Sequence, residues 1–188
     1  MTTVSKEEII LNPAELRLRL GGHIDGMTSE LVDKYKPEVY AAMRPCYCFK
    51  ETQVRLYDGG CDLGFGEINS KNLRKNLDGC SRAYVFAATL GSDIDRLLKK
   101  TALLSAAGQF VTDAIASAAI EALCDLAQER MPCKTKPRFS PGFGDLYITY
   151  QERILDFINA RKEIGIVLTQ SLLMTPTKSV SAIMGIRE

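Results

Sequence analysis

Apolar residues recur at helical spacing over one long stretch, from Gln109 to about Arg130, and form a broad face. This pattern predicts an amphipathic helix, and we expect Gly108 to break the chain just before it. The polar residues on the opposite side fall near one another: Asp113, Ser117, Glu121 and Gln128. The chain therefore offers one long helix with a polar row along the side away from its apolar face.

Shorter helices are predicted where a residue that caps helix N-termini precedes an apolar repeat. Asn12-Pro13 introduces one helix, which Gly21-Gly22 would end, and Ser70 and Ser92 introduce two others. Thr28 or Ser29 is expected to cap a fourth. We expect these and a C-terminal helix over residues 14–20, 28–43, 71–77, 92–106 and 151–160.

The run AYVFAATL, residues 83–90, is continuously apolar and predicts a buried strand. Further strands are expected over residues 54–57, 166–168 and 180–186. Helices and strands mix irregularly, so we predict an α+β fold with a mixed, largely antiparallel twisted sheet and flanking helices. The 188 residues fit a single domain, 1–188, that begins with an N-terminal helical segment over residues 1–50.

Composition excludes several classes of protein. Apolar residues make up 46% of the chain and the formal net charge is +1, which favours neither a nucleic-acid nor a membrane partner. No apolar run reaches 18 residues, and the start MTTVSKEEII lacks an apolar signal region. We therefore expect a cytoplasmic location.

Cysteine and histidine chemistry leaves one alternative open. Without a secretion signal the six cysteines predict reduced, mostly buried thiols rather than disulfides. Cys46 and Cys48 nevertheless form a CxC pair, with Cys61 and Cys80 following, so a cysteine-based metal or redox protein stays possible. The single histidine, His23, lies in a glycine-rich turn without a partner for nucleophilic catalysis, and no phosphate-binding glycine loop is present.

The segment RFSPGFGD, residues 138–145, is the most unusual loop of the chain. Pro141-Gly142 suits a type II turn, and a glycine there lets the backbone approach a neighbour closely. Arg138 offers a planar fork of donors that matches a carboxylate, and Phe139 and Phe143 offer apolar rings. The residue types alone favour a turn anchored in the core, with Arg138 in a surface ion pair.

A second unusual segment has hydroxyl side chains at alternate positions. In an extended chain they would point to one face, where they either line a polar ligand pocket or form the wet side of an edge strand. These residues are Thr169, Ser171, Thr175, Thr177, Ser179 and Ser181.

Together the two segments resemble the activation (reactivation) domain of cobalamin-dependent methionine synthase. That family carries an Arg-Pro-x-Pro-Gly-Tyr loop, a helix, and then Leu-Thr-Glu-Ser-x-x-Met-x-Pro-x-x-Ser-Val-Ser-Gly; this chain has RFSPGF and LTQSLLMTPTKSVSA at the same separation. The resemblance covers roughly residues 83–186 and is strongest to the single-domain activation proteins that act on a separate synthase.

The resemblance implies a function. Members of the family bind S-adenosylmethionine and support the reductive remethylation of cob(II)alamin, with one electron supplied by flavodoxin in well-known cases. The cobalamin would belong to the partner, a separate methionine synthase with its own cobalamin-binding domain, and this chain would present the methyl donor to it.

The resemblance also implies site residues. Arg138 matches an arginine that contacts the methionine end of the ligand, while Ser140, Pro141 and Gly142 match the loop beside it. The other implied ligand-binding residues are Phe143, Ser117, Glu121, Thr169 and Ser171.

Several positions depart from the family pattern. Phe143 replaces a tyrosine, Ser117 replaces an acidic ligand contact that Glu121 would supply instead, and Gln170 replaces a glutamate. The family's longer C-terminal sequence, with an aromatic pair near the adenosine, is not matched after Glu188. These departures keep a second hypothesis open, namely a non-catalytic interaction subunit of a corrinoid methyltransferase that has lost ligand binding.

Overall fold

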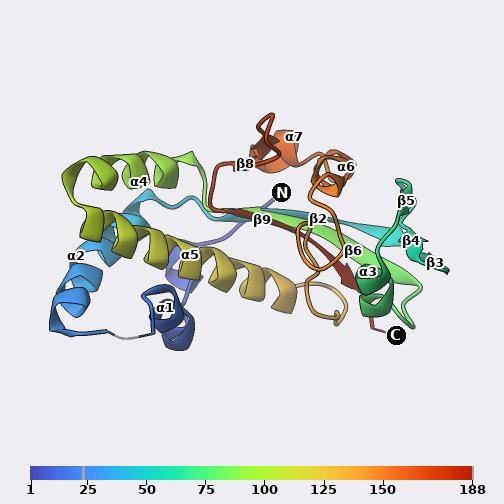
Figure 1. Cartoon of the computed structure of the whole chain (residues 1–188), viewed down its shortest axis with the longest axis horizontal. Coiled ribbons are helices and arrows are strands. Elements are labelled where there is room, and N and C mark those ends of the chain that lie inside the picture. The colour runs from blue at the N-terminus through green and yellow to red at the C-terminus, as the bar shows by residue number, and fades with distance from the viewer. Residues whose placement is uncertain (23, 188) are drawn as a thin grey trace.

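A four-stranded antiparallel sheet forms the centre of the computed structural model, which describes residues 1–22 and 24–187 (Figure 1). Its strand order is β1-β2-β6-β9, and every pairing in it is antiparallel. The bounds are β1 Thr2–Thr3, β2 Cys46–Gln53, β6 Arg82–Thr89 and β9 Ser179–Gly185. The predicted α+β class is confirmed.

Seven α-helices surround this sheet in the described part of the chain. They are α1 Pro13–Arg19, α2 Gly26–Ala42, α3 Lys71–Asn76, α4 Ser92–Leu104, α5 Ala106–Glu129, α6 Tyr150–Phe157 and α7 Ala160–Ile164. Two small sheets complete the fold, one from β3 Arg55–Tyr57, β4 Gly60–Asp62 and β5 Glu67–Ile68, the other from β7 Val167–Leu168 and β8 Met174–Thr175. A short 3-10 turn covers Lys6–Glu8.

The two faces of the central sheet carry separate apolar cores. Because successive side chains of a strand point to opposite faces, Phe86 of β6 packs towards α5 while Val85 packs towards α6. Helix α5 and the N-terminal residues cover the first face, with α1 and α2 packed against α5, and α3, α6 and α7 cover the second. Figure 1 shows α5 on one side of the sheet and α6 and α7 on the other.

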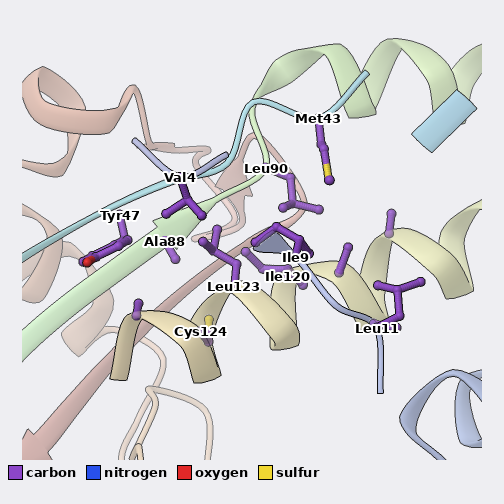
Figure 2. Packing of buried hydrophobic residues seen from close by; sticks show 14 of the residues in the cluster. Val4, Ile9, Leu11, Met43, Tyr47, Ala88, Leu90, Ile120, Leu123 and Cys124 are labelled. Atoms are coloured by element: carbon purple, nitrogen blue, oxygen red, sulfur yellow. The ribbon is translucent and has the colours of Figure 1, made fainter. Parts of the chain in front are cut away.

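The N-terminal segment belongs to the α5 core. Val4, Ile9 and Leu11 are buried, and Figure 2 shows them packed against α5 beside Ile120 and Leu123. The prediction of a helical segment over residues 1–50 was too broad, because the helices end at Ala42 and residues 46–50 belong to β2.

Strand β2, which the sequence analysis missed, explains the CxC pair. Cys46 and Cys48 are two positions apart on one strand and therefore share the face towards α6, whereas Tyr47 faces α5. Burial raises the pKa of the Cys48 and Cys61 thiols to about 12, which disfavours the thiolate that metal binding requires.

The expected break at Gly108 is wrong. Ser105 separates α4 from α5, and its side chain caps α5 by accepting a hydrogen bond from the Gly108 N–H at 3.1 Å. Position 108 lies inside α5, and it is a glycine because a side chain there would collide with the ring of Tyr35. A Cβ at this position would come within 2.4 Å of the Tyr35 hydroxyl oxygen.

Other boundaries move by a few residues. Asp25, not Thr28 or Ser29, caps α2 and accepts from the Thr28 N–H at 2.8 Å. Ser92 is the first residue of α4 rather than its cap. The predicted helix over residues 151–160 is two helices, α6 and α7. The caps at Asn12 and Ser70 are confirmed.

Candidate functional site

The segment before the RFSPGFGD turn runs along the outer edge of β9. Phe139 and Ile183 exchange both of their backbone hydrogen bonds at 2.9 Å, and the Lys136 N–H donates to the Gly185 carbonyl at 2.8 Å. This pairing sets the direction of each side chain. Phe139 is buried among residues of the α6 face, so Arg138, one position earlier, points to the α5 face.

A type II turn follows, as predicted. The Phe143 N–H donates to the Ser140 carbonyl at 3.1 Å, and Gly142 has a φ of 90°, which a residue with a side chain rarely adopts. The Gly142 N–H also donates to the Leu146 carbonyl at 2.7 Å, so the turn is closed on itself. These hydrogen bonds therefore fix the position of the turn tip, Pro141-Gly142, relative to Arg138.

Asp145 fastens the far end of the loop to α3. Its carboxylate accepts hydrogen bonds from the Ser70 hydroxyl and from the N–H groups of Lys71 at 2.8 Å and Asn72 at 3.2 Å. These bonds, that from Ser70 above all, lower the pKa of Asp145 below its ordinary value. The loop is thus hydrogen-bonded to β9 at one end and to α3 at the other.

Arg138 meets three acceptors on α5. Its Nη1 donates to Asp125 Oδ1 at 2.8 Å and to Gln128 Oε1 at 3.0 Å, and its Nη2 donates to Glu121 Oε2 at 3.2 Å. Burial lowers the pKa of the guanidinium, but Cys124, Asp125 and Glu121 together outweigh this effect, and the net pKa is raised. The arginine of the loop and the polar row of α5 therefore form one charged cluster.

Two open cavities meet at this cluster. The first, of about 640 Å³, is lined by Glu121, Asp125, Gln128, Thr135, Pro137, Arg138, Ser140, Val180 and Arg187. The second, of about 520 Å³, lies between α5 and the segment that includes Glu8, Asn12, Glu15 and Arg19. Glu121, Asp125 and Arg138 line both. We call the first cavity the α5 groove; its volume is in the range of small-molecule sites.

A second ion pair lies further along α5, towards its N-terminus. Lys178, which precedes β9, donates from Nζ to Asp113 Oδ1 at 2.7 Å and to Ser117 Oγ at 2.8 Å. Ser117 is buried. Its hydroxyl already accepts a hydrogen bond from a cationic side chain of this chain, that of Lys178. The predicted polar row of α5 exists, and each half of it holds one basic side chain.

The structure brings together some of the predicted ligand-binding residues. Arg138, Ser140 and Glu121 line the α5 groove, and Ser117 lies one turn of α5 before Glu121. Pro141 and Gly142 form the tip of the adjoining turn. Phe143, at the same tip, is 67% exposed and packs edge-on against Phe139, with ring centroids 5.6 Å apart.

Thr169 and Ser171 lie elsewhere. They sit in the turn between β7 and β8, where their hydroxyls hydrogen-bond each other at 2.9 Å. The hairpin packs on the α6 side of the sheet through Leu168 and Met174, away from α5 in Figure 1. Among the residues that the structure describes, neither hydroxyl contacts the α5 groove.

The expectation that the alternate hydroxyls share one face of an extended strand is wrong. The chain turns between β7 and β8, and only Ser179 and Ser181 lie within β9. Ser181 faces α6, where its hydroxyl is 3.5 Å from Gln151 Oε1. The side chains of this strand that face α5 are the even-numbered ones, such as Val180 and Ala182.

Sequence reasoning missed two charged residues of the site. Asp125 is four residues after Glu121 and so continues the same side of α5, a signal that helical spacing carries. Lys178 gave no such signal, because its direction depends on the phase of β9. Within residues 1–22 and 24–187 no group of three His, Cys, Asp or Glu side chains is arranged to hold a metal ion. His23 lies outside the described residues.

Comparison with known proteins relies on the fold. No protein-family model matches the chain, and no curated protein sequence matches it. A crystal structure described as the MetH reactivation domain bound to AdoHcy superposes with a TM-score of 0.74, over 98% of this chain and 77% of that one, at 14% sequence identity.

The chain has the fold of the MetH reactivation domain. The resemblance stated from the sequence is thereby confirmed at the level of the fold. It also extends beyond residues 83–186, because the superposition with the MetH reactivation domain takes in nearly the whole chain, N-terminal helices included. No helix in the described part of the chain is long and apolar enough to cross a lipid bilayer.

Proposed function

We propose that this chain binds S-adenosylmethionine and serves as an activation subunit for a separate cobalamin-dependent methionine synthase. The observation that carries the proposal is the fold, which it shares over 98% of its length with a reactivation domain crystallised with AdoHcy. The RFSPGF and LTQSLLMTPTKSVSA segments add sequence support at the same spacing as in the family. The α5 groove is the proposed ligand site.

Both charged groups of the ligand's amino-acid portion have a counterpart in the α5 groove. The Arg138 guanidinium suits the carboxylate of the methionine portion, and the Glu121 carboxylate suits its ammonium. Ser140 lies beside Arg138, and the glycine at position 142 allows a ligand to come close to the backbone. Phe143 supplies an exposed ring but no hydroxyl.

The chemistry asks this chain to position a reactant. The partner's cobalamin supplies the nucleophile that accepts the methyl group, and an external donor such as flavodoxin supplies the electron. When the methyl group is transferred, the sulfonium sulfur leaves as the neutral thioether of S-adenosylhomocysteine, so the chain needs no general acid or base of its own. Its contribution is to bind the methyl donor and to hold its methyl group at the partner's cofactor.

A reconstituted reaction tests the proposal. Purified chain, methionine synthase in the cob(II)alamin state, a reductant and S-adenosylmethionine are mixed, and methylcobalamin is followed by absorbance. We expect methylcobalamin to form only when all four components are present. Calorimetry with S-adenosylmethionine, with and without the synthase, gives the binding constant; absence of binding in both would overturn the proposal.

A second candidate function is a subunit that docks on a corrinoid methyltransferase without binding the methyl donor. One observation favours it: the Arg138 guanidinium is already hydrogen-bonded to three side chains of α5, and the Ser117 hydroxyl to Lys178. This candidate predicts that the chain co-purifies with methionine synthase, that calorimetry detects no ligand, and that the cob(II)alamin enzyme is not rescued.

A further inference from the structure

The three acceptors that hold Arg138 are not equally fixed. Gln128 also donates from Nε2 to Thr135 Oγ1 at 2.8 Å, and Glu121 also lies 3.6 Å from Arg19 Nη2. Asp125 has no hydrogen-bond or ion-pair partner other than Arg138 among the residues that the structure describes. Its side chain is 65% exposed, against 35% for Glu121. Asp125 is therefore the partner that Arg138 exchanges most easily.

We propose that Asp125 occupies Arg138 in the ligand-free protein and is displaced by the carboxylate of the ligand's amino-acid portion. The inference rests on the proposed function and gives Asp125, which accepts a hydrogen bond from Arg138 Nη1, a role in that site. Asp125 and a ligand carboxylate compete because both are planar acceptors for the same guanidinium edge.

The exchange is favourable because its two ends differ in exposure. Arg138 is 19% exposed and stays paired with Glu121 and Gln128 throughout. Asp125 turns out into water, where a carboxylate is well solvated and an exposed ion pair contributes little. Glu121 stays in the groove, where it remains available to the ligand's ammonium. One acid thus leaves and another stays.

Selectivity follows from this competition. Asp125 weakens only ligands that need the Arg138 edge, namely those with an amino-acid carboxylate. S-Adenosylhomocysteine has that carboxylate, whereas 5′-methylthioadenosine carries the same nucleoside and sulfur without the amino acid. Asp125 therefore lowers the affinity of the α5 groove for S-adenosylhomocysteine relative to its affinity for 5′-methylthioadenosine.

Calorimetry of two variants with the two probes tests the inference. Asp125→Asn is expected to lower the dissociation constant of S-adenosylhomocysteine about two- to fivefold, the range that an exposed ion pair gives, and to leave that of 5′-methylthioadenosine unchanged. Glu129→Gln is the matched control, because it removes an exposed acid one turn further along α5 that does not touch Arg138. Glu129→Gln is expected to leave the ratio of the two dissociation constants unchanged.

A double variant separates a specific role from a general change in charge. In the Arg138→Ala background, Asp125→Asn is expected to have no effect on S-adenosylhomocysteine. Weaker or unchanged binding of S-adenosylhomocysteine to Asp125→Asn overturns the role of Asp125 alone and leaves the proposed function standing. Absence of binding to both the unaltered chain and Asp125→Asn overturns the two together.

Discussion

The two segments that carry the resemblance, residues 138–145 and 164–186, behave differently in the fold. The first sends its arginine to α5 and its tip to the rim of the α5 groove. The second sends Thr169, Ser171 and Ser181 to the α6 side, while Lys178 and the even-numbered side chains of β9, such as Val180 and Ala182, face α5. Phe139 of the first segment pairs with Ile183 of the second, yet only the first segment places predicted ligand-binding residues in the lining of the α5 groove.

The difference comes from how each segment meets the sheet. Residues 135–139 pair with β9, so their side chains alternate in a register that Ile183 fixes. Residues 166–175 form a separate hairpin, and their hydroxyls are used within its turn. A side chain of a strand therefore reaches a site only if the strand lies beside that site and the residue is on the face that points to it.

The largest expected effect tests the first segment. Arg138→Ala is expected to weaken S-adenosylmethionine binding about 10- to 100-fold, because it removes charge-assisted hydrogen bonds to the ligand's carboxylate. Arg138→Lys keeps the charge without the planar fork and should fall between the two. Calorimetry measures the affinities, and thermal unfolding checks that both variants fold. Unchanged affinity in Arg138→Ala would move the ligand away from the α5 groove.

The turn beside Arg138 gives the next effect. Gly142→Ala is expected to lower the free energy of unfolding by about 1–2 kcal/mol, because alanine is strained at a φ of 90°. The new Cβ would lie 3.6 Å from the Ile148 side chain, an ordinary contact, so backbone strain is the cause. Urea denaturation measures the change. Gly26→Ala, at a glycine without positive φ and with open space around it, is the control and should show no loss.

Lys178 is the second segment's own contribution to α5. Lys178→Met keeps the length of the side chain but removes its hydrogen bonds to Asp113 and Ser117. We expect a loss of about 1 kcal/mol in the free energy of unfolding, measured in urea. Asp113→Asn and the double variant complete a cycle; additive effects would mean that the pair does not contribute.

Asp145 predicts a pH dependence for the first segment. The pKa of this carboxyl is lowered in the folded protein, so its stabilising contribution is present above its ordinary value of 3.8 and is lost as the pH falls through the lowered pKa. The unaltered chain should lose more stability than Asp145→Asn between neutral pH and a pH below 3.8. Urea midpoints at both pH values measure this. Equal losses of stability in the two proteins would show that the Asp145 carboxylate does not hold the loop to α3.

The smallest expected effect concerns Thr169 and Ser171. Replacing both with alanine is expected to leave S-adenosylmethionine affinity unchanged, because their hydroxyls bond each other on the α6 side. Calorimetry beside Arg138→Ala provides the contrast. A tenfold loss would restore the sequence-based assignment of both residues to the ligand site and would break the distinction between the two segments.

Local signals predicted much of the fold. The apolar face of α5, the continuous run of β6 and the caps at Asn12 and Ser70 are each encoded within a few residues. Strand β2 was missed because its second half, KETQ, is polar and gains its place only by pairing with β6. Gly108 was wrongly predicted to break the helix, because the need for glycine there comes from the ring of Tyr35 on another helix.

The site was predictable where helical spacing decides and not where strand phase decides. Glu121 and Gln128 lie on one side of α5, as their spacing indicates, and both meet Arg138. That Arg138 faces α5 at all follows from the register of Phe139 on Ile183, which connects positions far apart in the sequence. The same kind of long-range register directs Lys178 to Ser117.

The strand-like segment before the RFSPGFGD turn also covers one edge of the central sheet. Its hydrogen bonds occupy the outer edge of β9, from Ile183 to Arg187, which would otherwise be free to pair with a strand of another molecule. The backbone that directs Arg138 to α5 thus also occupies an edge at which another strand could pair. Sequence changes that loosen residues 134–139 would cost both properties at once.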